Sequence, residues 1–168
     1  SEYLIKNYIN MKKIIIVFSI LLLIGCKSKK VVTTAEPEKA KIEKLGLSEV
    51  NESQKNKAYE LGKRVLMTCN TSKFKPFNQS EATESVIKNT TEERLTKTCT
   101  RFRQYYGTFI DLQLVEIYKN NFDGTTIFRY KALYSKKVAN KELRVSMNQE
   151  NKVSSIKSLD WVTPFSMN

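Results

Sequence analysis

The spacing of apolar residues changes near Gly107, and this change constrains the fold more than any other feature of the sequence. Before Gly107, apolar side chains recur every three or four residues, which is the spacing of an amphipathic helix. After it, they alternate with polar ones, which is typical of a strand with one buried face. We therefore expect an α+β domain in which N-terminal helices pack on a curved antiparallel sheet.

Three helices are expected before this change. Ser48 is a plausible N-cap for the first, Thr90 and Glu93 offer a capping box for the third, and Gly107 suits the stop of that helix. The approximate ranges are 49–68, 81–88 and 91–105.

About four strands are expected after it, joined by short turns so that successive strands pair antiparallel. In the second strand, Phe128, Tyr130 and Tyr134 share one face and Arg129 and Lys131 share the other. The approximate ranges are 108–118, 125–135, 143–147 and 153–159.

Residues 11–26 carry a second strong pattern. Lys12 and Lys13 precede an apolar run that ends at Ile24, and Gly25 separates this run from Cys26. The run is too short to span a bilayer as a helix, which takes about 20 apolar residues. A basic start, a short apolar run and a small residue before the end are typical of a signal peptide that is removed.

The tetrapeptide Leu23-Ile24-Gly25-Cys26 resembles the lipobox of bacterial lipoprotein signal peptides. The resemblance implies that residues 11–25 are removed and that the thiol of Cys26 carries diacylglycerol. Two or more acyl chains hold a protein stably on a membrane. We therefore expect a lipoprotein anchored to a bacterial membrane through Cys26.

The rest of the chain divides on composition. Residues 1–10 lie upstream of an expected natural start at Met11, residues 26–47 are expected to be a lipidated flexible tether, and residues 48–168 form one globular domain. No acidic residue follows Cys26 directly, which in the lipobox family favours the outer membrane, on its periplasmic side.

The formal net charge of +12 and the lack of histidine bound the function. A basic surface attracts anionic partners such as an anionic envelope polymer. Catalytic histidines and histidine-ligated zinc are excluded, and the chain lacks the motifs of nucleic-acid-binding modules. We expect no cofactor, no metal site and no catalytic residue.

Cys69 and Cys99 are the cysteines of the expected domain, 30 positions apart. Exported proteins keep disulfides, so these two can form one bridge. Two buried free thiols are the alternative. Spacing alone does not decide between them.

The order of elements, together with a helix ending in Phe102 to Gly107 and the strand opening Gly107 to Asp111, resembles exported domains of the nuclear transport factor 2-like superfold. The resemblance covers about residues 48–160. It implies a curved sheet wrapped around helices, often with a pocket in the cone, for which Phe128, Tyr130 and Tyr134 are the lining candidates. Members include isomerases, dehydratases, ligand binders and dimerisation modules, so the fold does not choose the function.

Three functions stay open. The first is a non-catalytic envelope domain that binds a small ligand or a protein. The second is an enzyme in which Asp111 acts with Tyr105, Tyr106 or Tyr130 as acid and base. The third is an accessory subunit of an envelope complex, which an exposed apolar patch would indicate. A dimer is compatible with each of them.

Overall fold

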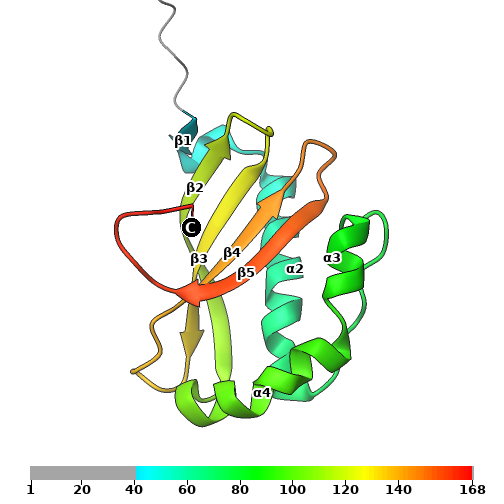
Figure 1. Ribbon diagram of the computed structural model, residues 1–168. Helices are drawn as coiled ribbons and strands as arrows, with labels where there is room; N and C mark the ends of the chain where they lie inside the picture. Colours follow the sequence, from blue (N-terminus) through cyan, green and yellow to red (C-terminus); the bar gives the residue numbers. More distant parts are fainter. Residues whose placement is uncertain (1–40, 168) are drawn as a thin grey trace, which may run out of the picture. The chain divides into compact units, whose positions relative to one another are not determined.

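The computed structural model of the protein describes residues 41–167 (Figure 1). The expected signal peptide, including Leu23, Ile24 and Gly25, and the expected lipidation site Cys26 lie outside the described residues. The described elements are β1 (Ile42–Leu45), the 3-10 helix η1 (Leu47–Glu49), α2 (Glu52–Thr71), α3 (Glu84–Asn89), α4 (Glu92–Tyr106), β2 (Phe109–Asn120), β3 (Thr126–Tyr134), β4 (Lys141–Met147) and β5 (Val153–Asp160).

The described strands form one antiparallel sheet in the order β1-β2-β3-β4-β5, so each strand pairs with its neighbours in sequence. The expected α+β fold, with helices followed by an antiparallel sheet, is confirmed at this level. The sheet has five strands rather than about four. β3 pairs with β4 through Phe128 opposite Val145 and Arg129 opposite Arg144.

β1 corrects the expected tether boundary. Ile42 pairs with Asn120 and Leu45 pairs with Ile117, so these residues belong to the sheet and the domain begins before Ser48. β1 covers the C-terminal end of β2 and satisfies backbone groups that an edge strand would otherwise leave unpaired. Two of its four residues, Glu43 and Lys44, are charged and adjacent, so the sequence of β1 lacks the alternation that is typical of a strand.

Two helix starts also differ from expectation. The side chain of Asn51, not Ser48, caps α2, accepting from the amide of Ser53 at 2.7 Å. Thr91, not Thr90, caps α4 and accepts from the amide of Arg94 at 3.3 Å. In both cases a polar side chain closer to the first turn reaches its free N–H groups.

α3 begins later than expected because the preceding backbone pairs with the sheet. Val153 donates to the carbonyl of Glu81 and accepts from the amide of Thr83, both at 2.9 Å. The stop of α4 at Gly107 is confirmed, and its φ of 82° is a value that glycine adopts without steric cost.

The main core lies between α2 and one face of the sheet. Gly62 allows the close approach, since a Cβ there would lie 2.9 Å from Leu143 Cδ2 and 3.0 Å from Val145 Cγ2. The largest fully buried apolar side chains of the core are Tyr130, Phe128, Ile117, Leu143, Met147, Val145 and Val153.

Candidate functional site

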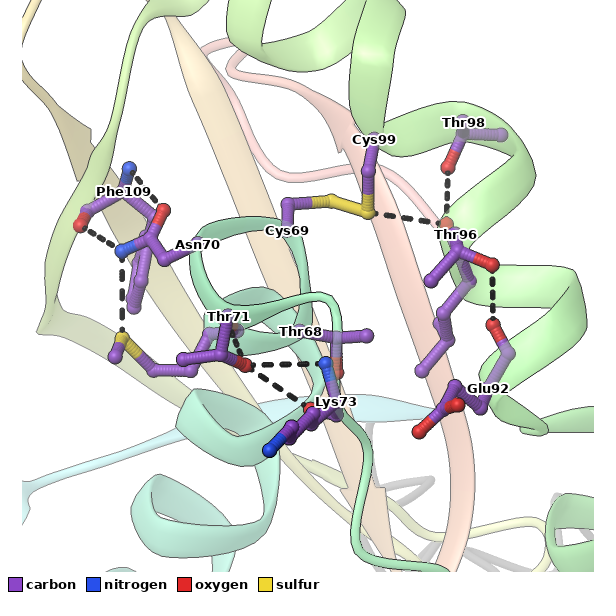
Figure 2. Close-up of a disulfide and its surroundings, with 12 residues drawn as sticks. Thr68, Cys69, Asn70, Thr71, Lys73, Glu92, Thr96, Thr98, Cys99 and Phe109 are labelled. Carbon is purple, nitrogen blue, oxygen red and sulfur yellow. Dashed lines mark hydrogen bonds between the residues drawn. A yellow bond between two sulfur atoms is a disulfide. The ribbon is translucent and has the colours of Figure 1, made fainter.

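The two cysteines of the domain form a disulfide. Figure 2 shows Cys69, near the end of α2, joined to Cys99 in α4. Their Cα atoms lie 4.8 Å apart although the residues are 30 positions apart. The bridge therefore fixes the end of α2 against α4.

Asn70 ties the same end of α2 to the sheet (Figure 2). Its Nδ2 donates to the carbonyl of Phe109 at 2.8 Å, and its Oδ1 accepts from the amide of Phe109 at 3.1 Å. The side-chain amide thus replaces a strand partner at the first residue of β2. With the disulfide, it fixes α2 to α4 and to the sheet within two residues.

The three candidate pocket residues contribute to packing. Phe128 and Tyr130 are 0% and 1% exposed and belong to the core. The Tyr130 hydroxyl is buried without a hydrogen-bond partner in the described part of the chain, and burial raises the pKa of Tyr130. Tyr134 packs on Tyr106 and Phe109, and its burial raises its pKa to about 12. Tyr134 also lines a surface hollow of about 200 Å³ at the β3–β4 turn.

Asp111 meets other partners than those expected. Its Oδ1 accepts from the hydroxyl of Tyr59 at 2.6 Å and from Nζ of Lys63 at 3.0 Å, and Lys63 also donates to the Tyr59 hydroxyl at 2.8 Å. Tyr105 is 56% exposed, and Tyr106 packs edge-on against Phe102.

This arrangement determines what the carboxylate can do. The hydrogen bonds from Tyr59 and Lys63 lower the pKa of Asp111, and the hydrogen bonds that Lys63 donates to Tyr59 and to Asp111 raise the pKa of Lys63. A carboxylate base is made effective by a raised pKa, and a lysine nucleophile by a lowered one. The lowered pKa of Asp111 disfavours a role as a base, and the raised pKa of Lys63 disfavours a role as a nucleophile. Both shifts favour an ion pair between the two side chains.

A cluster of charged side chains lies buried on the sheet face opposite α2. Arg129 is 1% exposed, Glu142 0% and Arg144 5%. Arg129 Nε and Arg144 Nε donate to opposite oxygens of Glu142, at 2.8 and 2.9 Å. We call these three residues, with Glu116 and Lys44, the charged cluster.

Glu116 extends the cluster toward β1. Its Oε1 accepts from Nζ of Lys44 and its Oε2 from Nη1 of Arg129, each at 2.7 Å. The hydrogen bond from Lys44 is the main cause that lowers the pKa of Glu116 to about 2, and the bond from Arg129 adds to it. A carboxylate held by two cations stays ionised.

Residues 161–167, which we call the strap, lie over Arg129 and Arg144 of the charged cluster. Figure 1 shows this segment, drawn in red, returning from the end of β5 toward β2. Arg129 Nη2 donates to the carbonyl of Val162, and Arg144 Nη1 donates to the carbonyl of Ser166 at 2.8 Å. The strap thus supplies acceptors for guanidinium groups that the sheet alone leaves unsatisfied.

Aromatic rings of the strap lie on the same cations. The guanidinium of Arg129 lies 3.8 Å from the ring centroid of Trp161, and that of Arg144 lies 4.6 Å from the ring of Phe165. Phe165 also stacks on Tyr118 at 4.0 Å. Cation–π contacts of this kind strengthen when the cation is shielded from water.

Sequence reasoning missed the charged cluster. Strand alternation placed Arg129 on the face away from Phe128 and Tyr130, but this pattern does not show what covers that face. The available signal was the aromatic pair Trp161 and Phe165 directly after the last strand.

A hollow with a volume of about 700 Å³ lies between the loop before α3 and the β4–β5 turn. Phe77, Ala82 and Ile87 supply its apolar lining. Its polar lining includes two ion pairs, Glu84 with Lys88 and Glu150 with Lys152. This volume is within the range of small-molecule sites in proteins.

Comparisons with known proteins add no relative. No family model, no curated protein and no solved structure matches the chain. Among residues 41–167, no helix has the length and apolar character needed to cross a bilayer. In the same range, no three His, Cys, Asp or Glu side chains gather where they could hold a metal ion.

Proposed function

We propose that the protein is a bacterial envelope lipoprotein, anchored through acyl chains on Cys26, whose domain binds a partner without catalysis. The lipobox sequence Leu23-Ile24-Gly25-Cys26 carries the proposal. The Cys69–Cys99 disulfide supports it independently, because disulfides persist in exported proteins and are rare in the cytosol. The outer membrane, on its periplasmic side, is the proposed location.

Two observations favour binding over catalysis. Asp111, the acid of the enzyme hypothesis, is held ionised by Tyr59 and Lys63. The hollow of about 700 Å³ offers an apolar lining with charged residues around it, which suits a small ligand or a peptide side chain. The net charge of +12 favours an anionic partner, such as an envelope polymer.

The likeness to the nuclear transport factor 2-like superfold also belongs to this proposal. Helices followed by an antiparallel sheet support it, while a closed cone around a central pocket is part of the proposal only. The accessory-subunit hypothesis is the second candidate. Exposed apolar residues at one end of the sheet favour it, with Ile110 57% and Val138 71% exposed.

Radiolabelled palmitate tests the anchor. The wild-type chain, expressed in a bacterium, should take up label and fractionate with the envelope, and Cys26→Ala should lose both. Cys69→Ala is the matched control, since it removes a cysteine outside the lipobox and should keep the label. Equal labelling of the wild type and Cys26→Ala would overturn the proposal.

Native mass spectrometry of the detergent-purified, acylated protein tests the binding role. A co-purifying mass that Ile87→Glu removes would assign a ligand to the hollow. Val138→Glu, which places the same charge at an exposed position outside the hollow, should keep that mass. A protein subunit that co-purifies with the wild type and with Ile87→Glu, but is lost from Val138→Glu, would instead favour the accessory role.

A further inference from the structure

The β2–β3 turn exposes an aromatic ring. Phe122 is 83% exposed, the largest fraction among the exposed large hydrophobic residues of the described chain. Single exposed apolar residues are common in folded proteins, so the position of Phe122 matters more than its exposure.

Phe122 lies where the chain enters the sheet. The amide of Asn121 donates to the carbonyl of Lys41 at 3.0 Å, and Ile42, the first residue of β1, pairs with Asn120. Cys26 precedes Lys41 by 15 positions. A fully extended chain of this length spans about 50 Å, so Cys26 can lie at most about that far from this turn. The lipid anchor and the exposed ring are thus joined to the same end of the sheet.

The other end of the sheet provides a comparison. Val138, in the β3–β4 turn, is 71% exposed. β3 has nine residues, which separates the two turns by about 30 Å. Figure 1 shows β1 and the β2–β3 turn at one end of the sheet and the β3–β4 turn at the other.

Charges around Phe122 are balanced. Nζ of Lys41 lies 5.9 Å from the ring centroid, and Lys119 donates to the carbonyl of Gly124 at 2.7 Å. Against these cations stand Glu43, which accepts from Asn121 at 3.4 Å, and Asp123, which accepts from Thr125 at 2.8 Å. A contact at this turn therefore depends on the apolar ring rather than on net charge.

We propose that Phe122 is a second membrane contact, which seats the β2–β3 turn in the bilayer interface beside the anchor. The inference rests on the proposed lipid anchor and adds the orientation of the domain on the membrane. An exposed phenyl ring gains free energy when it leaves water for the acyl boundary. The anchor keeps the turn within about 50 Å of the surface, which raises the effective concentration of the ring at the bilayer and lets a single ring favour one orientation.

Site-specific photo-crosslinking in the full chain tests this contact. A benzophenone amino acid replaces Phe122 in one variant and Val138 in another, and each variant is expressed in a bacterium with radiolabelled palmitate. Both positions are exposed, so neither substitution disturbs the core. Lipid adducts are expected to be about tenfold more abundant from position 122 than from position 138.

A second arm uses the purified acylated variants in vesicles of neutral lipid, with and without anionic lipid. The position-122 adduct should form equally in both. Equal lipid adducts from the two positions, protein adducts at 122, or none there would overturn the inference while palmitate on Cys26 preserves the proposed anchor. Loss of the palmitate label from both variants would overturn the anchor and the inference together.

Discussion

The two faces of the sheet are closed by different chemistry, and adjacent residues of β4 show the contrast. Leu143 is 1% exposed and contacts α2, whereas Glu142 is 0% exposed and holds two arginines beneath the strap. Both side chains are equally removed from water. One face is closed by apolar packing and the other by ion pairs, hydrogen bonds and aromatic rings.

The two faces should respond differently to substitutions. An apolar face loses contacts in proportion to the atoms removed, because neighbours close part of the cavity. A buried ionic face needs a partner for every charge, and removing one leaves the others in a poorly solvating site. The face that carries the charged cluster, which we call the outer face, should therefore be the more sensitive to single substitutions.

Glu142→Ala should have the largest effect, because Arg129 and Arg144 would lose the carboxylate they share. We expect a loss of about 3–5 kcal/mol in the free energy of unfolding, measured by urea titration. Leu143→Ala, on the other face, is the matched control and should cost about 2–5 kcal/mol. A Glu142→Ala cost below about 1 kcal/mol would show that water reaches under the strap and would remove the contrast.

Removing the disulfide tests the helix side. The bridge closes a loop of 30 residues, so replacing Cys69 and Cys99 together by Ala should lower the free energy of unfolding by about 3–4 kcal/mol. Reductant should lower the wild-type urea midpoint and leave that of the double variant unchanged. A response of the double variant to reductant would point to another cause.

Acid should weaken the outer face first. Because the pKa of Glu116 is lowered to about 2, its ion pairs stabilise the fold fully above its ordinary pKa of 4.5, and this contribution is lost as the pH falls from 4.5 to 2. We expect about 2 kcal/mol, allowing for solvent around Lys44. Glu116→Gln should flatten this part of the pH–stability curve, and Glu84→Gln, in an exposed pair, should leave it unchanged.

Phe165→Ala should have a smaller effect, about 1 kcal/mol, because it removes the ring contacts to Tyr118 and Arg144 but keeps the backbone acceptors of the strap. Hydrogen exchange should rise in the strap more than in β3. Val162→Ala, at a position 52% exposed, should change neither quantity. Equal effects of the two variants would mean that the ring contributes little.

Asp111→Asn should have the smallest effect on stability. Its ion pair with Lys63 is well exposed, with side-chain exposures of 43% and 34%, and such pairs contribute little. The urea midpoint should move by no more than the experimental error. A large shift would show that Asp111 supports the sheet edge more strongly than its exposure indicates.

Much of the fold was predictable because local patterns determine it. The spacing of Ala58, Leu61 and Val65 on α2 and the alternation through Phe128 and Tyr130 each mark a single buried face, and Gly107 marks the point of change. These signals depend on neighbours in sequence. Helix caps shifted by one to three residues where several polar residues competed for the same position.

The missed features depend on contacts between distant residues. β1 forms because Ile42 meets Asn120, far along the chain, and its own four residues carry no strand pattern. Tyr59 reaches Asp111 across 52 positions. The charged cluster was missed because alternation along a strand indicates the side of the sheet on which a residue lies and not what covers that side.

The strap contains Trp161, the single tryptophan of the chain, with its indole against the guanidinium of Arg129. Intrinsic fluorescence excited at the indole therefore comes from one place, the cover of the outer face, and the helix-side core is silent in it. A spectral change without loss of helical circular dichroism would report the strap lifting while the rest stays folded. Trp161 is thus an intrinsic fluorescence probe for the sheet face that carries the charged cluster.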